Sequence, residues 1–241
     1  MSHDDAGFST RAIHAGQDPD PLTGAVVPPL VMASTFTQDG VGNLRNGYEY
    51  ARAANPTRDA LQTQLASLEG ARRAFSFSSG LAAEDALMRA VLTPGDTILM
   101  GNDVYGGTHR LASRIFGRWG ITVVVVEMTN TDAVATAIAE HSPKIVWLET
   151  PSNPFMKVSD IQAISALSGA ALLVVDNTFA SPYLQRPLEH GAQVVIHSTT
   201  KYLGGHSDVV GGAVITSDDE LAEKVGFHQF AAGAISAPME A

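Results

Sequence analysis

Lys201 is the first residue of interest because of its place in the chain. It follows the apolar run "AQVVIH" and three hydroxyl residues, and it precedes the pair Gly204-Gly205. The chain has only four lysines, so a lysine at the end of a buried strand calls for a chemical explanation. An amine placed there can form a Schiff base with an aldehyde.

Polar residues follow four further apolar runs in the same way. Runs of β-branched residues that alternate with helical segments indicate a mainly parallel sheet covered on both faces. Ligands of such sheets bind beyond the carboxyl ends of the strands. The residues at these ends are Ser78, Ser79 and Gly80 after 72–77, Tyr105 after 97–100, Glu149 and Asn153 after 144–148, Asp176 and Thr178 after 171–175, and Ser198, Thr200 and Lys201 after 193–197.

These groups together indicate one ligand. Ser-Ser-Gly at a helix start offers backbone N–H groups and a helix dipole to a phosphate, and the hydroxyls of Ser198 and Thr200 add donors. Tyr105 offers a flat face for stacking, and Asp176 a buried carboxylate that pairs with a protonated ring nitrogen. With the amine of Lys201, the set describes a site for pyridoxal phosphate.

Each residue taken alone has a simpler explanation. A lysine after a strand is commonly a solvated loop residue, an aspartate there is commonly a cap, and Tyr105 suits a core. His197, His206 and Asp208 fit no strong metal-binding spacing. The chain has no G-x-x-x-x-G-K-[ST] and no G-x-G-x-x-G, so nucleotide binding has little support. Convergence of five strand ends on one ligand favours the cofactor.

Composition narrows the class of protein further. The chain has 241 residues, a hydrophobic fraction of 45%, and a formal net charge of −10, which argues against a nucleic-acid partner. It has no cysteine and therefore no disulfide or thiolate chemistry. The first residues lack the pattern of a signal peptide, and no apolar run is long enough to cross a membrane. We expect a soluble cytoplasmic protein.

The chain divides into two zones that differ in their content of turn-forming residues and in hydrophobic periodicity. Residues 1–57 are rich in turn formers and have no sustained period, which predicts an N-terminal arm. Residues 58–241 alternate between segments with helical periodicity and segments with strand periodicity, and they are expected to form one cofactor-binding domain. Helices are predicted over 58–70, 80–92, after Tyr105, and over 131–140 and 159–168, and strands over 72–77, 96–100, 121–127, 144–149, 171–176 and 193–197.

The motifs resemble those of the pyridoxal-phosphate enzymes of cysteine and methionine metabolism, the transsulfuration family. They are "YEYARAANPT", "SSGLAA", "NDVYGGTHR", "ETPSNP" and the stretch from "VVDNTFASPY" to "HSTTKYLGGHSDVVGG". The resemblance implies the large domain of the fold-type-I transferases, an α/β domain with a mainly parallel sheet of seven-stranded type between helices.

The resemblance also implies roles for single residues. Lys201 carries the cofactor, Asp176 faces its ring nitrogen with Thr178 beside it, Tyr105 stacks on the ring, and Asn153 reaches the ring hydroxyl. The phosphate is held by Ser79, Gly80, Leu81, Ser198 and Thr200, and by Tyr50 and Arg52 of the neighbouring subunit, so the arm crosses to a partner in a homodimer or homotetramer. Family members are longer and have a smaller C-terminal domain, which this chain does not contain.

The exact reaction stays open within the family. "YGGTHR" resembles cystathionine γ-synthases and γ-lyases, which act at Cγ of homoserine-derived amino acids, whereas methionine γ-lyases tend to have a cysteine in place of Gly107. Arg110 and Glu149 are the candidates for substrate binding, although a surface position on a helix would also explain Arg110. O-acyl-homoserine sulfhydrylation is another alternative. A cofactor-binding or assembly module without catalysis is the non-enzyme alternative.

Overall fold

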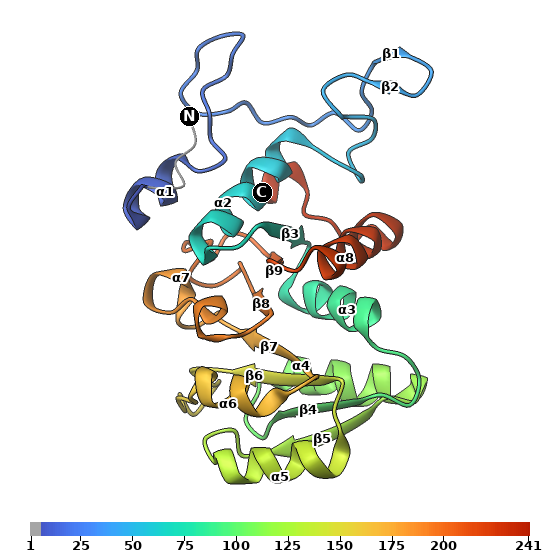
Figure 1. Cartoon of the computed structure of the whole chain (residues 1–241). Coiled ribbons are helices and arrows are strands. Elements are labelled where there is room, and N and C mark those ends of the chain that lie inside the picture. Colours follow the sequence, from blue (N-terminus) through green and yellow to red (C-terminus); the bar gives the residue numbers. More distant parts are fainter. Residues whose placement is uncertain (1–5) are drawn as a thin grey trace.

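A seven-stranded mixed sheet forms the centre of the molecule in the computed structural model, which describes residues 6–241 (Figure 1). The strand order is β3-β9-β8-β7-β6-β4-β5, and β9 runs in the direction opposite to that of the other six strands. The strands are β3 (Arg73–Phe77), β4 (Thr97–Gly101), β5 (Thr122–Val126), β6 (Ile145–Glu149), β7 (Leu172–Asp176), β8 (Val194–His197) and β9 (Gly212–Thr216). The prediction of an α/β domain with a mainly parallel sheet is confirmed.

Helices cover both faces of the sheet, as the alternating pattern predicts. One face packs against α3 (Gly80–Val91), α8 (Asp219–Ala232) and the segment of α4 (Gly106–Arg110), η1 (Leu111–Ile115) and η2 (Phe116–Trp119). The other face packs against α2 (Pro56–Glu69), α5 (Thr131–His141) and α6 (Ile161–Ser168). Two short helical turns, α7 (Ser181–Leu184) and η3 (Pro187–His190), lie between β7 and β8, and a third, η4 (Pro238–Glu240), follows α8.

Two elements of the sheet domain were not predicted. β9 is fully buried between β3 and β8, and α8 packs against α3. The run "GAVIT" has the β-branched character of the other strands, but it follows a loop rather than a helix, so the alternating pattern does not reveal it. β9 runs antiparallel to both of its neighbours, and residues 198–211 connect it to β8.

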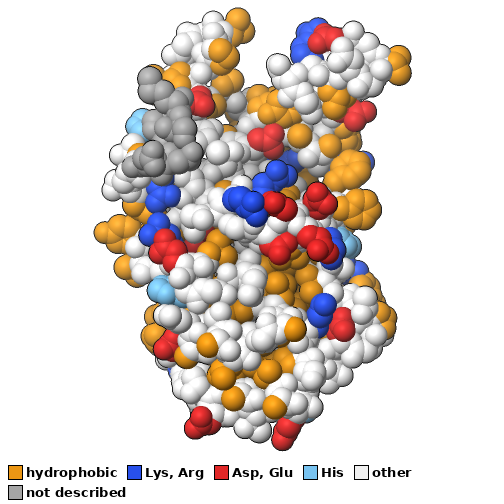
Figure 2. Space-filling view, viewed as in Figure 1, with side chains coloured by type: hydrophobic (Ala, Val, Ile, Leu, Met, Phe, Trp, Pro, Cys, Tyr) orange, Lys and Arg blue, Asp and Glu red, His pale blue; other side chains and the backbone are white. Residues whose placement is uncertain are grey.

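The N-terminal arm contains more regular structure than its sequence indicates. Helix α1 (Phe8–His14) packs on α2, and β1 (Gln38–Gly40) pairs with β2 (Asn43–Leu44). Most of residues 17–54 project from the sheet domain at the top of the view (Figure 1, Figure 2). Its apolar side chains are unusually exposed: Leu22 is 90% exposed and Val26 74%. The described part of the arm, residues 6–57, therefore has no core of its own.

Helix α2 begins where the arm ends, and its boundaries follow from local chemistry. Asn55 caps the first turn by accepting the N–H groups of Thr57 and Arg58, and Pro56 occupies the first helical position. Gly70 ends the helix in the left-handed conformation. No helix of residues 6–241 has the length and apolar character needed to cross a bilayer.

Candidate functional site

A pocket of about 270 Å³ opens at the carboxyl ends of the parallel strands. Five strand ends and the first turn of α3 contribute to its wall, as the sequence predicts. The lining residues are Ser79, Gly80, Leu81, Glu84, Tyr105, Glu149, Asn153, Asp176, Thr178, Phe179, Ser198, Thr200, Lys201 and Val210. The structure thus brings together eleven of the fourteen predicted site residues, and Tyr50, Arg52 and Arg110 are the three that lie elsewhere.

The N-terminus of α3 forms one end of this pocket. Ser79 caps the helix: its hydroxyl accepts the N–H of Ala82 and its carbonyl accepts the N–H of Ala83. The N–H groups of Gly80 and Leu81 precede these bonds and have no intrahelical acceptor, because the first turn of a helix leaves its donors unsatisfied. They form an anion-binding position at the positive end of the helix dipole.

Ser198 lies directly against this helix terminus. A Cβ atom on Gly80 would lie 3.0 Å from Cβ of Ser198, so only glycine allows the loop after β8 to approach this closely. The hydroxyl of Thr200 is engaged differently: it accepts the N–H of Gly211 at 3.0 Å and donates to the carbonyl of Gly211 at 3.2 Å. Ser198 is therefore the freer of the two hydroxyl donors.

Asp176 ends β7 and is buried on the pocket wall. Its Oδ1 atom accepts two hydrogen bonds from Thr178, one from the N–H at 3.0 Å and one from the hydroxyl at 2.6 Å. Both bonds fall on the same oxygen, so neither uses Oδ2. Burial raises the pKa of Asp176, while the bonds from Thr178 and the nearby His197 act in the opposite direction.

Glu149 ends β6, the neighbouring strand, and it is paired with Asp176 in the sheet register. Its Oε2 atom accepts the backbone N–H of Tyr105 at 2.6 Å. Burial, and then the charge of Asp176, raise the pKa of Glu149 to about 8. Glu149 and Asp176 therefore lie on adjacent strand ends, where ionisation of one carboxyl disfavours ionisation of the other.

Glu84 is a pocket residue that the sequence analysis missed. It lies on α3, one turn after the helix start, and is only 3% exposed. Its Oε1 accepts the hydroxyl of Thr108 at 2.9 Å, whereas Oε2 is buried without a hydrogen-bond partner in the described structure. Burial, and then the charges of Asp176 and Glu149, raise its pKa well above the usual value. In sequence Glu84 is a polar residue within an amphipathic helix, which gives no sign of its burial.

The ring of Tyr105 lies at the mouth of the pocket and is 46% exposed. It is folded over Gly107, where an added Cβ would lie 2.3 Å from ring atom Cε1. Lys201 is exposed on the loop after β8, and Asn153 is half-buried on the loop after β6. An aromatic face, an amine and an amide thus meet the buried carboxyls across a single pocket.

Three predicted residues lie outside the pocket of their own chain. The guanidinium of Arg52 donates to the carbonyl of Phe230 at 2.7 Å and stacks on the ring of Phe230, 4.7 Å from its centroid. Tyr50 is 42% exposed on the arm. Arg110 is exposed at the end of α4. The roles predicted for all three stay predictions.

The residues present fit pyridoxal phosphate. Free N–H groups at the start of α3 suit its phosphate, and the face of Tyr105 suits its ring. Asp176, Glu149 and Glu84 form a buried acidic wall that requires a cationic atom to be fully ionised. A protonated ring nitrogen is such an atom, and the amine of Lys201 is available at the open side of the pocket.

Comparison with known proteins gives the same result. A family model described as Cys/Met metabolism PLP-dependent enzyme matches residues 9–241. The chain belongs to this family. Its cofactor is therefore pyridoxal 5'-phosphate, and the resemblance in the motifs is confirmed.

Individual members of the Cys/Met metabolism family are also similar. A cystathionine gamma-synthase of Mycobacterium bovis is 53% identical over 98% of this chain, and a cystathionine beta-lyase of Lactococcus lactis is 47% identical over 97%. The chain spans 61% of the length of each. A solved structure described as metB of Corynebacterium glutamicum superposes with a TM-score of 0.97 at 48% identity, covering 100% of this chain and 63% of that one. A cystathionine gamma-synthase of Xanthomonas oryzae pv. oryzae, solved in complex with cystathionine, has a TM-score of 0.94 at 43% identity and is covered to 61% of its length, with 98% of this chain matched.

Proposed function

We propose that this chain holds the cofactor site of a transsulfuration enzyme that acts at Cγ of homoserine-derived amino acids. The observation that carries the proposal is the meeting of Lys201, Asp176 and the N-terminus of α3 in one pocket. The substrate is a small amino acid such as cystathionine, an O-acyl-homoserine or cysteine. We place the reaction in the cytoplasm, where thiols such as cysteine are kept reduced.

Some pocket residues bind the cofactor, and others hold or transfer protons. Bound pyridoxal phosphate supplies an electron sink for the bond that is broken at Cα of the amino acid. The helix N-terminus and Ser198 hold the phosphate in place. Asp176 keeps a proton on the ring nitrogen, since a buried carboxylate is stable only beside a cation. Lys201 anchors the cofactor, and its amine then moves the Cα proton.

Tyr105 and Glu149 act at the side of the pocket near α4. The ring of Tyr105 covers the cofactor face, and the bond from its N–H to Glu149 holds the start of the helix against β6. Arg110 lies on the same short helix, and its charge suits a substrate carboxylate. Each of the proposed substrates is an amino acid and carries a carboxylate that could approach α4.

The arm is proposed to complete the site of a neighbouring subunit in a homodimer or homotetramer. The guanidinium of Arg52 lies outside the pocket of its own chain, and the arm exposes apolar side chains such as Leu22. An arginine is well suited to hold a phosphate through two hydrogen bonds. Tyr50 and Arg52 of one chain are therefore assigned to the phosphate of the partner's cofactor.

The alternatives differ in the bond that is made or broken. The relatives include enzymes named for synthesis of cystathionine and for its cleavage, so the substrate class is better supported than the direction. We favour γ-synthase because a γ-synthase is 53% identical, against 47% for the β-lyase. γ-Lyase activity, sulfhydrylation and methionine γ-lyase activity are the enzyme alternatives, and a cofactor-binding module without turnover is the other.

Two measurements test the proposal. Protein loaded with pyridoxal phosphate is reduced with borohydride, and the modified peptide is identified by mass spectrometry. We expect the label on Lys201, its loss in Lys201→Ala, and its retention in the control Lys224→Ala. Turnover is then measured with O-acyl-homoserine plus cysteine and with cystathionine. A label on another lysine would refute the assignment, and a correct label without any turnover would favour the binding module.

A further inference from the structure

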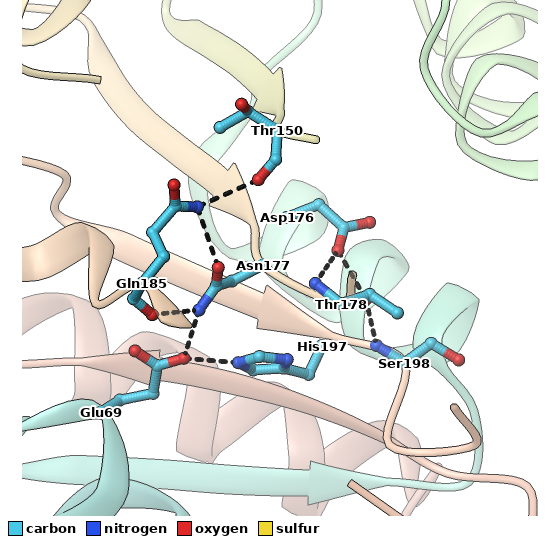
Figure 3. Close-up of polar contacts among 8 residues, drawn as sticks. All are labelled: Glu69, Thr150, Asp176, Asn177, Thr178, Gln185, His197 and Ser198. Carbon is cyan, nitrogen blue, oxygen red and sulfur yellow. Dashed lines mark hydrogen bonds and ion pairs between the residues drawn. The ribbon is translucent and has the colours of Figure 1, made fainter. Parts of the chain in front are cut away.

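Behind the pocket, on the opposite face of the sheet, lies a second polar cluster of Glu69, Asn177, Gln185 and His197. Side chains alternate between the two faces along a strand. Asp176 and Ser198 face the pocket, so Asn177 and His197, their neighbours in sequence, face the other way, toward α2 and α7 (Figure 3). The cluster therefore contacts the ends of β7 and β8 on the face of the sheet opposite the pocket.

Glu69 and His197 form the centre of this cluster. Glu69 Oε1 and His197 Nε2 are 2.5 Å apart, and both side chains are completely buried. Glu69 is the last residue of α2, where the negative end of the helix dipole disfavours a carboxylate. A carboxylate kept in that position, away from water, requires a cationic partner. The ring of His197 lies at ion-pair distance and supplies this charge when it is protonated.

Hydrogen bonds extend the pair to three segments next to the pocket. Asn177 Nδ2 donates to Glu69 Oε1 at 2.9 Å and to the carbonyl of Gln185 at 2.8 Å. Gln185 Nε2 donates to Asn177 Oδ1 and to the carbonyl of Thr150, both at 3.0 Å. Thr150 follows Glu149 and Asn177 follows Asp176, so the chain of bonds joins the ends of β6, β7 and β8 (Figure 3).

A shorter chain of bonds joins the same strand ends on the pocket side. The N–H of Ser198 donates to Thr178 Oγ1 at 2.9 Å, and that hydroxyl donates to Asp176 Oδ1. The strand ends that hold Asp176 and Ser198 are therefore linked from both faces of the sheet. A displacement of His197 would be transmitted directly to Ser198, its neighbour in the chain.

Stability alone does not explain the pair. Glu69 Oε2 and His197 Nδ1 are buried without hydrogen-bond partners in the described structure. A buried ion pair with unsatisfied atoms contributes little net stability compared with apolar residues of similar size. The position of the pair directly behind the site is the feature that requires an explanation.

We propose that Glu69 and His197 form a buried ion pair that positions the cofactor-holding ends of β7 and β8 and sets the charge environment of Asp176. The proposal rests on the proposed function, since it assigns these residues to the site of pyridoxal phosphate. Asp176 shares the pocket with Glu84 of α3 and Glu149 of β6, and its charge also interacts with that of His197 behind the sheet. The two glutamates disfavour its ionisation, and His197 favours it.

The test compares His197→Phe, His197→Gln and Glu69→Gln with Val195→Ala in the holoenzyme. Val195 is the matched control: it lies two residues earlier on β8, on the same face, and packs with Leu65 of α2. Its truncation leaves a cavity but removes no hydrogen bond. Three quantities are measured for each variant: the dissociation constant of pyridoxal phosphate, the pH midpoint of the visible absorbance of the bound cofactor, and the melting temperature without cofactor.

We expect His197→Phe to weaken cofactor binding at least tenfold and to raise the absorbance midpoint by about 0.5 pH unit or more, because loss of a nearby positive charge favours the protonated form of the cofactor. His197→Gln keeps a donor for Glu69 and should restore part of the affinity but not the midpoint. Glu69→Gln should weaken binding less than His197→Phe. Val195→Ala should lower the melting temperature with affinity and midpoint unchanged.

The result that overturns the proposal is equally defined. If His197→Phe does not fold, His197→Gln and Glu69→Gln decide: wild-type affinity and midpoint in both would refute a positioning role. Equal losses of affinity in Val195→Ala and the His197 variants would make the effect one of general stability. Failure of the wild-type protein to bind pyridoxal phosphate would instead contradict the proposed function, so the two failures are distinguishable.

Discussion

Glu149 Oε2 accepts the backbone N–H of Tyr105 at 2.6 Å, so the residue that ends β6 holds the residue from which α4 begins. This bond joins the acidic wall of the pocket to its aromatic side. The bond holds the carboxyl of Glu149 in place, and both burial and the charge of Asp176 disfavour ionisation of this carboxyl. The same arrangement predicts how the cofactor-free protein responds to pH.

Stability of the cofactor-free protein should fall as the pH rises from about 4.5 to about 8. The pKa of Glu149 is raised from 4.5 to about 8 in the folded state, so the folded state binds more protons in this window. The contribution is complete below pH 4.5 and is lost as the pH passes 8, with a slope of at most about 1.4 kcal/mol per pH unit from this group. Glu84 and Asp176 act in the same direction.

Urea unfolding at a series of pH values measures this slope. Glu149→Gln should flatten the curve, because the amide cannot ionise but still offers an oxygen to the N–H of Tyr105. Glu127 is a suitable control carboxylate, because its bond with Lys157 lowers its pKa instead. A slope in Glu149→Gln equal to that of wild type would show that this carboxyl is not the source.

Asp176→Asn should preserve the fold and reduce turnover by about a hundredfold or more. The amide can still accept the bonds of Thr178 on its oxygen, but a neutral group cannot hold a proton on the ring nitrogen as strongly. The melting temperature and kcat are measured together, with Thr178→Val as a variant that keeps the carboxylate but removes one bond to Oδ1 and the acceptor of the Ser198 N–H. Turnover near the wild-type rate in Asp176→Asn would show that the carboxylate has another task.

Glu84→Gln should bind pyridoxal phosphate about as well as wild type, whereas Glu84→Ala should be destabilised by about 1–3 kcal/mol. The raised pKa of Glu84 favours the neutral acid, which glutamine imitates, while alanine leaves the buried hydroxyl of Thr108 without its acceptor. Equilibrium dialysis and chemical unfolding report the two quantities. If the glutamine variant lost as much affinity as the alanine variant, an ionised Glu84 would be needed in the holoenzyme.

Gly107→Ala should displace the ring of Tyr105 and alter the absorbance of the bound cofactor. The added Cβ would lie 2.3 Å from ring atom Cε1, so the ring must move, and its 46% exposure allows it to move with little loss of stability. Gly106→Ala on the same helix is the matched control, because a Cβ there meets no atom within 4 Å. Identical spectra for both variants would show that a side chain at residue 107 does not control the position of the Tyr105 ring.

A mixture of Lys201→Ala and Arg52→Ala subunits should regain activity after subunit exchange, although each variant alone is inactive. If the arm crosses between subunits, some hybrid sites receive an intact Lys201 from one chain and an intact Arg52 from the other. A mixture of Lys201→Ala with Asp176→Asn is the control, because both residues line the pocket of one chain and no site regains both. Hybrids as inactive as the parents would place Arg52 outside the neighbouring site.

Most of the pocket was predictable from sequence because its residues follow recognisable strands. Lys201 and Asp176 come at or soon after the ends of β-branched runs, and parallel strands bring such ends to one edge of a sheet. The Ser79 cap has an equally local signature. These predictions need only the order of elements and the direction of the strands.

Other parts of the site have no such local signal. Glu84 lies in a helix and Glu69 at the end of one, positions that are usually solvated for a glutamate. β9 was missed because a loop over residues 198–211, rather than a helix, precedes it. Contacts between residues more than a hundred positions apart, such as that of Glu69 with His197, are invisible in any short window of sequence.

The sequence by itself determined the alternation of strands and helices, the family, and the polar residues at the strand ends, because periodicity and capping act over a few residues. The burial of Asp176 was predicted from its strand, but tertiary structure alone decided which other acidic residues lose their water. Glu69, Glu84 and Glu149 differ from the solvated acids of this chain only in burial and in their neighbours. Burial depends on the packing of distant segments, and the free energy of a charge depends on that burial.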